Sequence, residues 1–175
     1  MKTVDRESFL RRVRSLKTKS TNWKTAESRW LYHERAIAQL LQRPTTPERV
    51  LELGAFGAQL VPGSHTMDRL ESGWRFKGNA PTYAHDARDI PWPIADGAYD
   101  WFVALRVFHH LRSVHEAAFR EALRVSRNVL IVVPERTFKP GKPDKGITRE
   151  RFREWLEPAH EEDVGQWGRL YVWHQ

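Results

Sequence analysis

The stretch from Val50 to Gly57 constrains the fold of this chain more than any other part of the sequence. It is a short apolar run with one acid, Glu52, and it ends in a turn that contains two glycines, Gly54 and Gly57. A buried strand delivers the backbone to such a turn, and residues without bulky side chains let a ligand approach the main chain. The stretch therefore predicts a strand that leads directly into a ligand-binding turn.

Short apolar runs alternate with helical or turn-rich segments from residue 49 onward. The run Asn128–Val133 is apolar on both faces, as a strand covered on both sides must be. Helices are predicted at 5–17, 26–42, 113–125 and 148–156, the third of them with a capping box of Ser113 and Glu116. Strands are predicted at 49–53, 65–67, 82–85, 99–105, 128–133 and 169–174, with the last at an edge of the sheet. This order favours an α/β fold with a Rossmann-like, mainly parallel sheet and helices on both faces.

Composition limits the class of protein. A chain of 175 residues is long enough to bury a core in one domain. The absence of cysteine excludes disulfides, thiolate nucleophiles and Cys-ligated metal centres, and we expect no metal site. No apolar run approaches the ~20 residues that cross a bilayer, and the N-terminus is too polar for a signal peptide. We therefore expect a cytoplasmic protein with no membrane partner.

The net charge of +7 lies entirely in the first part of the chain. Residues 1–49 hold 12 Lys/Arg against 5 Asp/Glu, whereas residues 50–175 hold 17 of each. A basic segment of this kind is either a contact surface for nucleic acid or an acidic partner, or a solvated helix face. We expect residues 1–48 to be a basic helical lead that packs on or covers a core formed by residues 49–175.

Acidic residues follow the predicted strands in order. Asp68 stands 14 residues after Gly54 at the end of the second run, and Asp86 ends the third. A proline-containing loop comes next, and then the run Asp100–Leu111, which opens a strand with Asp and closes with His-His-Leu. The carboxyl ends of strands are where open α/β sheets bind ligands, so these acids are expected at one edge of the sheet.

This ordered set resembles the class I S-adenosylmethionine-dependent methyltransferases over roughly residues 48–135, about half of the chain. The resemblance is closest to the branch that acts on small molecules, and Phe119–Val125 is similar to the helix that leads into the fifth strand of that family. It implies that residues 49–175 form a methyltransferase-like α/β domain with S-adenosylmethionine as cofactor. An N-terminal helix covers the cofactor in many relatives, which makes Tyr32 and His33 candidates for a lid.

The resemblance also implies a place for each part of the cofactor. Backbone amides of the glycine turn meet a carboxylate, Asp68 accepts from the ribose hydroxyls, and Asp86 accepts from the adenine amino group. Leu105 and Arg106 border the methyl-transfer region, where Arg106 can hold an anionic substrate group. The expected cofactor-binding residues are Glu52, Gly54, Ala55, Gly57, Asp68, Asp86, Ala87, Leu105 and Arg106. His109 and His110 are the candidate catalytic bases, because the pKa of histidine lies near the working range.

The sequence departs from the family pattern in the glycine turn and in the next crossover. Phe56 and Ala58 stand where the family has its second and third glycines. Only residues 58–64 separate Gly57 from His65, whereas a crossover with its helix takes at least ~10–12 residues. The first crossover is therefore expected to be short, with a vestigial helix.

Three functions fit these observations. The first is a methyltransferase for a small molecule. The second is an RNA-directed methyltransferase or RNA-binding protein that uses residues 1–49, with Trp23 and Trp30 as stacking surfaces. Many amino-directed nucleic-acid enzymes carry Asn/Asp-Pro-Pro-aromatic where this chain has Val103–Val107, which favours the first function. The third is a degenerate, non-catalytic interaction module, which Phe56 favours. The oligomeric state is left open.

Overall fold

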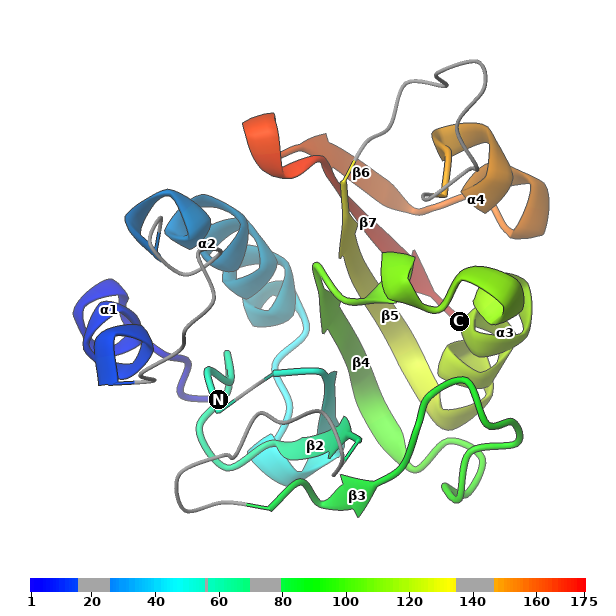
Figure 1. Ribbon diagram of the computed structural model, residues 1–175, viewed down its shortest axis with the longest axis horizontal. Helices are drawn as coiled ribbons and strands as arrows, with labels where there is room; N and C mark the ends of the chain where they lie inside the picture. Colours follow the sequence, from blue (N-terminus) through cyan, green and yellow to red (C-terminus); the bar gives the residue numbers. More distant parts are fainter. Residues whose placement is uncertain (16–25, 56, 70–79, 135–146) are drawn as a thin grey trace.

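The computed structural model describes residues 1–15, 26–55, 57–69, 80–134 and 147–175. Within these ranges seven strands form one sheet in the order β3-β2-β1-β4-β5-β7-β6 (Figure 1). The strands from β3 to β5 pair in parallel, and β7 pairs antiparallel with both β5 and β6. Their bounds are β1 Val50–Leu53, β2 His65–Asp68, β3 Tyr83–Ala84, β4 Tyr99–Leu105, β5 Ser126–Val133, β6 His160–Asp163 and β7 Arg169–His174. The predicted Rossmann-like, mainly parallel sheet is confirmed.

Helices cover both faces of the sheet, as the alternation of side chains along β4 shows. Trp101 and Val103 face the core beneath α2, whereas Phe102 and Ala104 face the core beneath α3. Figure 1 accordingly shows α1 and α2 on one side of the sheet and α3 on the other. The four helices are α1 Arg6–Ser15, α2 Ala26–Gln42, α3 His115–Val125 and α4 Arg149–Trp155. None of the helices in the described ranges is long and apolar enough to cross a membrane.

Several predicted features lie outside the described residues. They are the last two positions of the helix predicted at 5–17, the stacking candidate Trp23 and the turn residue Phe56. The first crossover is short, as expected, and no helix occurs in the described residues between β1 and β2.

The prediction that the last strand lies at an edge was wrong. β7 lies between β5 and β6, and β6, which the pattern did not predict, forms that edge of the sheet. The sequence of β6 is polar, and its acids pair with arginines instead of entering the core. Arg153 lies 2.9 Å from Glu161, and Arg35 lies 3.3 Å from Glu162. A strand held by pairing with β7 and by ion pairs has no apolar period to detect.

The predicted capping box at the start of α3 was also wrong. The helix begins at His115, its N-cap is Val114, and no side chain caps it. Ser113 lies inside a short 3₁₀ turn, Arg112–Val114, instead of in the extended conformation that an N-cap requires. Glu116 pairs with Arg120 one turn further along the helix, at 2.8 Å.

Candidate functional site

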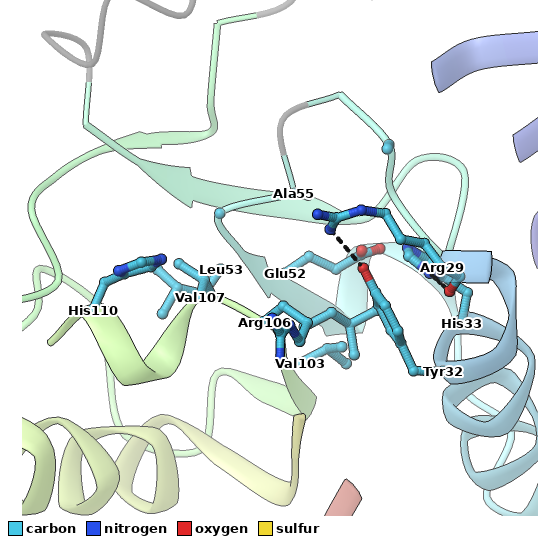
Figure 2. Close-up of a pocket in the computed structure, with 13 residues that line it drawn as sticks. Arg29, Tyr32, His33, Glu52, Leu53, Ala55, Val103, Arg106, Val107 and His110 are labelled. Atoms are coloured by element: carbon cyan, nitrogen blue, oxygen red, sulfur yellow. Dashed lines mark hydrogen bonds between the residues drawn. The ribbon is translucent and has the colours of Figure 1, made fainter. Parts of the chain in front are cut away.

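A cavity of about 130 Å³ lies between the carboxyl ends of β1 and β4 and the side of α2 (Figure 2). Six predicted site residues line it, namely Glu52, Gly54, Ala55, Leu105, Arg106 and His110. Five others lie outside its lining, namely Gly57, Asp68, Asp86, Ala87 and His109. The remaining lining residues are Arg29, Tyr32, His33, Leu53, Ala58, Val103 and Val107. Among the described residues no group of three or more His, Asp or Glu side chains is suited to hold a metal ion.

Gly54 is fixed as glycine by two independent constraints. Its φ is +63°, and a Cβ built on it would lie 2.7 Å from Cγ2 of Val107. Its amide donates to the carbonyl of Met67 at 3.0 Å, which ties the turn to β2. Gly57 also has a positive φ of +72°, and its carbonyl accepts from Nε of Arg12 at 2.6 Å. The glycine turn is thus held from the sheet on one side and from α1 on the other.

Glu52 organises the short crossover. Its side chain is buried, and its two oxygens accept from the amides of Leu60 at 2.8 Å and Val61 at 3.0 Å and from the hydroxyl of Ser64 at 2.8 Å. Burial raises the pKa of Glu52 to about 7, although these three bonds act in the opposite direction. The Glu52 side chain thus orders the backbone between β1 and β2, where a longer crossover would have a helix.

Asp68 has an acceptor available at the end of β2. Oδ1 accepts from the amide of Arg69 at 2.7 Å, whereas Oδ2 is buried and has no hydrogen-bond partner among the described residues. Burial raises the pKa of Asp68, and the nearby charge of Asp86 acts in the same direction. A buried carboxylate oxygen without a donor is costly, so this position fits a ligand that brings hydroxyl groups.

Asp86 is held by arginines in the turn after β3. Nε and Nη2 of Arg88 donate to its two oxygens at 3.0 and 2.6 Å, and Arg69 lies 3.7 Å away. These contacts, with the Arg88 hydrogen bond the largest, lower the pKa of Asp86. The next residue, Ala87, is buried, and its carbonyl accepts from the indole of Trp92 at 3.0 Å. The turn is therefore rigidly placed one strand away from Asp68.

Arg106 follows β4 in the left-handed region, with φ of +60°. Its Nη1 donates to the carbonyl of Trp167 at 2.6 Å, and its guanidinium lies 5.4 Å from the centroid of that indole ring. Trp167 belongs to the turn between β6 and β7, and its own ring nitrogen donates to the carbonyl of Ser28 at 2.7 Å. The hairpin of β6 and β7 thus contacts both α2 and Arg106 through Trp167, beside the cavity.

Three side chains of α2 form the wall opposite the strand ends (Figure 2). Arg29 donates to the hydroxyl of Tyr32 at 3.1 Å and lies 4.8 Å from the Trp167 ring centroid. His33 is buried, and Nδ1 lies 2.9 Å from the carbonyl of Arg29. Because a carbonyl only accepts, Nδ1 carries the proton and Nε2 is an acceptor. Burial lowers the pKa of His33 to about 4, so the ring is neutral at ordinary pH.

The two predicted bases occupy different positions. His110 is exposed and lines the cavity, whereas His109 is half-buried and does not. Their ring centroids are 4.0 Å apart in the 3₁₀ turn Phe108–His110. His110 is therefore the one of the pair that is placed to meet a ligand in the cavity.

Sequence reasoning missed Arg29 and Trp167. Trp167 is 139 residues from its partner Ser28, so no local pattern joins them. The two glycines that flank its turn, Gly165 and Gly168, mark a turn but not its destination.

No family model matches this sequence, and no curated protein matches it. Solved structures match its fold. A SAM-dependent methyltransferase from Aquifex aeolicus is 13% identical with a TM-score of 0.62, over 93% of this chain and 96% of that one. Phosphoethanolamine N-methyltransferase 1 of Haemonchus contortus, in complex with phosphoethanolamine and S-adenosylhomocysteine, is 12% identical with a TM-score of 0.62, over 97% of this chain and 49% of that one. The chain therefore has the fold of class I S-adenosylmethionine-dependent methyltransferases.

The fold of this chain is also similar to that of a protein named for a different activity. The 4+2 cyclase SpnF is 19% identical with a TM-score of 0.55, over 83% of this chain and 62% of that one. A fold can host more than one chemistry, so the function has to be argued from the site.

Proposed function

We propose that this chain is an S-adenosylmethionine-dependent methyltransferase that acts on a small molecule. The observation that carries the proposal is the buried Oδ2 of Asp68, which has no hydrogen-bond partner among the described residues at the carboxyl end of β2. A ribose presents two adjacent hydroxyl donors to such an acceptor, as in dinucleotide-binding folds. The cavity at the ends of β1 and β4 supplies the adjoining space.

The other cofactor contacts follow from strand order. In this proposal Asp86 and the amide of Ala87, in the turn after β3, bind adenine, and the backbone of Gly54, Ala55 and Gly57 binds the amino-acid end. Adenine recognition by Asp86 adds a ligand to a carboxylate that already accepts from Arg88. Glu52 contributes to the site through the crossover that it holds, because its oxygens already accept three bonds.

When bound, S-adenosylmethionine supplies the methyl group and leaves as S-adenosylhomocysteine, with the sulfur retaining the electron pair of the broken bond. The chain brings an O, N or C nucleophile into line with that methyl group in the cavity between α2 and the end of β4. His110, which lines the cavity, accepts the proton that the acceptor loses. The ring of His109 packs against that of His110 in a tilted arrangement, with an interplanar angle of 40°, and orients it.

Isothermal titration with S-adenosylhomocysteine tests the proposal. We expect saturable binding to the wild-type protein and a loss of roughly 10- to 100-fold in affinity for Asp68→Asn, because a hydrogen bond to a charged group contributes about 1.5–3 kcal/mol. Asp89→Asn is the matched control, since Asp89 is an exposed acid in the loop after β3. Absence of binding at millimolar concentration would refute the proposal and favour a non-catalytic interaction module.

The RNA-directed alternative receives less support. Trp30, one of its two stacking candidates, packs against Phe9, with ring centroids 5.5 Å apart, and is only partly exposed. Exposed arginines on α1, including Arg11 and Arg14, are consistent with an acidic partner and equally with a solvated helix face. A steep salt dependence of RNA binding would favour this alternative over a small-molecule substrate.

A further inference from the structure

The strand order sets the direction in which a bound cofactor runs. Asp86, Asp68 and Gly54 follow β3, β2 and β1, which are consecutive neighbours in the sheet, and β4 is the next strand. Neighbouring strands are about 4.8 Å apart, so the ends of β3 and β4 are separated by roughly 14 Å. If adenine, ribose and the amino-acid end occupy the first three positions, the end of β4 lies beyond the methyl group, on the acceptor's side.

Two arginines line the cavity at this position. Arg106 comes from the end of β4 and Arg29 from α2, and both line the cavity. Both lie against the same indole ring of Trp167, at 5.4 and 4.8 Å from its centroid. Arg29 also donates to the hydroxyl of Tyr32 at 3.1 Å. Burial raises the pKa of that hydroxyl, and the charges of Arg29 and Arg106 both act in the opposite direction. Residues far apart in the chain therefore place two positive charges at the same cavity.

The described lining of the cavity contains more basic than acidic side chains. Among the described residues that line it, Glu52 is the one acid. Its carboxylate oxygens accept from the crossover, and burial favours the neutral form of the group. His33 is neutral as well, and His110 carries positive charge when protonated. An anionic ligand therefore finds two guanidinium groups in this lining, and the one carboxylate there is already bonded to the crossover.

The backbone of Arg106 points to the same conclusion. A non-glycine residue in the left-handed region is strained, and such residues concentrate at ligand sites. Its amide donates to the carbonyl of Val132 at 2.8 Å, which fixes the conformation after β4. A guanidinium has five donors, so a bond to the Trp167 carbonyl is compatible with a bidentate bond to an oxyanion.

We propose that the methyl acceptor carries an oxyanion, a carboxylate or a phosphate, which Arg29 and Arg106 bind against the ring of Trp167. This inference rests on the proposed methyltransferase function and adds the chemical class of the substrate. Arginine suits the task because it stacks on an aromatic face and donates to an oxyanion in the plane of the same group.

The test uses the full chain saturated with S-adenosylhomocysteine and titrated separately with inorganic phosphate and with acetate, at constant ionic strength. We expect saturable binding of at least one anion, with the stronger one identifying the acceptor group. Arg106→Gln and Arg29→Gln should each weaken that binding about tenfold or more, and Arg29→Gln should leave the S-adenosylhomocysteine affinity unchanged within about twofold. Arg120→Gln is the control, because Arg120 lies on the exposed face of α3 and pairs with Glu116. Arg29→Gln keeps the test decisive if Arg106→Gln does not fold.

Two results would overturn the inference. One is S-adenosylhomocysteine binding with no measurable binding of either anion. The other is a pattern in which the arginine variants bind S-adenosylhomocysteine more weakly than the wild type does but bind 5′-methylthioadenosine equally well. 5′-Methylthioadenosine lacks the amino-acid carboxylate. That pattern would assign the arginines to the cofactor. Failure of S-adenosylhomocysteine itself to bind would refute the methyltransferase proposal, and anion titration of the unliganded protein would then still decide whether the arginines form an oxyanion site.

Discussion

Replacement of Gly54 by alanine separates the two constraints on the glycine turn. The first is conformational, since φ is +63° and an L-residue in this region costs roughly 1–2 kcal/mol. The second is steric, since the new Cβ would lie 2.7 Å from Cγ2 of Val107, and overpacking of this kind costs about 1–3 kcal/mol. Together they predict that Gly54→Ala lowers the free energy of unfolding by about 2–5 kcal/mol.

The chain offers a matched control for the first constraint. Gly97 has φ of +61° but no heavy atom within 4 Å of a Cβ built on it, so Gly97→Ala carries the conformational cost alone. We expect it to lose about 1–2 kcal/mol. Urea denaturation of both variants measures the two losses, provided that the slope m is the same.

A double-mutant cycle with Val107→Ala tests the steric part directly. In that background the 2.7 Å contact with Cγ2 is removed and only the 3.2 Å contact with Cβ of residue 107 remains, so the cost of Gly54→Ala should fall toward that of Gly97→Ala. Equal losses for Gly54→Ala and Gly97→Ala in the wild-type background would refute the reasoning, because they would show that Val107 does not exclude a side chain from the turn.

Two further predictions concern Glu52 and the helix caps. Burial raises the pKa of Glu52 from 4.5 to about 7, so the folded chain holds a proton that the unfolded chain releases in this range. The contribution of this group to the free energy of unfolding therefore falls by about 3 kcal/mol between pH 4.5 and 7 and is level above pH 7. Urea denaturation at several pH values across this range should show a fall of the free energy of unfolding with pH that is smaller in Glu52→Gln by this amount. An identical pH dependence in both proteins would contradict the assignment. For the caps, Thr148→Ala should lower the free energy of unfolding by about 1 kcal/mol, because Thr148 accepts from the amide of Arg151, whereas Ser113→Ala should change it by less than about 0.5 kcal/mol. A loss for Ser113→Ala as large as that for Thr148→Ala in the same assay would show that Ser113 does cap α3.

The periodic parts of the fold could be predicted from the sequence because local pattern and tertiary role agree there. β5 is apolar on both faces, and helices cover both faces in the structure. β6 could not be predicted, since Glu161 and Glu162 are held by arginines instead of by an apolar core. The capping box failed because 3₁₀ turns occupy the segment from Phe108 to Val114, and sequence spacing does not distinguish these from the first turn of a helix.

The site divides in the same way. Asp68 and Asp86 could be proposed from sequence because each follows a recognisable strand, and strand ends share one edge of a parallel sheet. The pairing of Arg29 and Arg106 at the cavity could not be proposed from sequence, because it depends on contacts between α2, the end of β4 and the turn before β7. The bond from Trp167 to Ser28 spans 139 residues, and it exists only once the hairpin of β6 and β7 has folded back onto α2.

The short crossover bears directly on the proposed oxyanion site. With a full first crossover, the N-terminus of its helix would present free amides and a positive dipole to an anionic ligand at this edge of the sheet. Here the amides of Leu60 and Val61 point instead at Glu52, so the crossover directs them into its own core. Positive charge at the cavity comes from Arg29 and Arg106. Because Arg29 belongs to α2, the basic N-terminal segment is part of the site's wall, and its charge acts inside the cavity as well as on the surface.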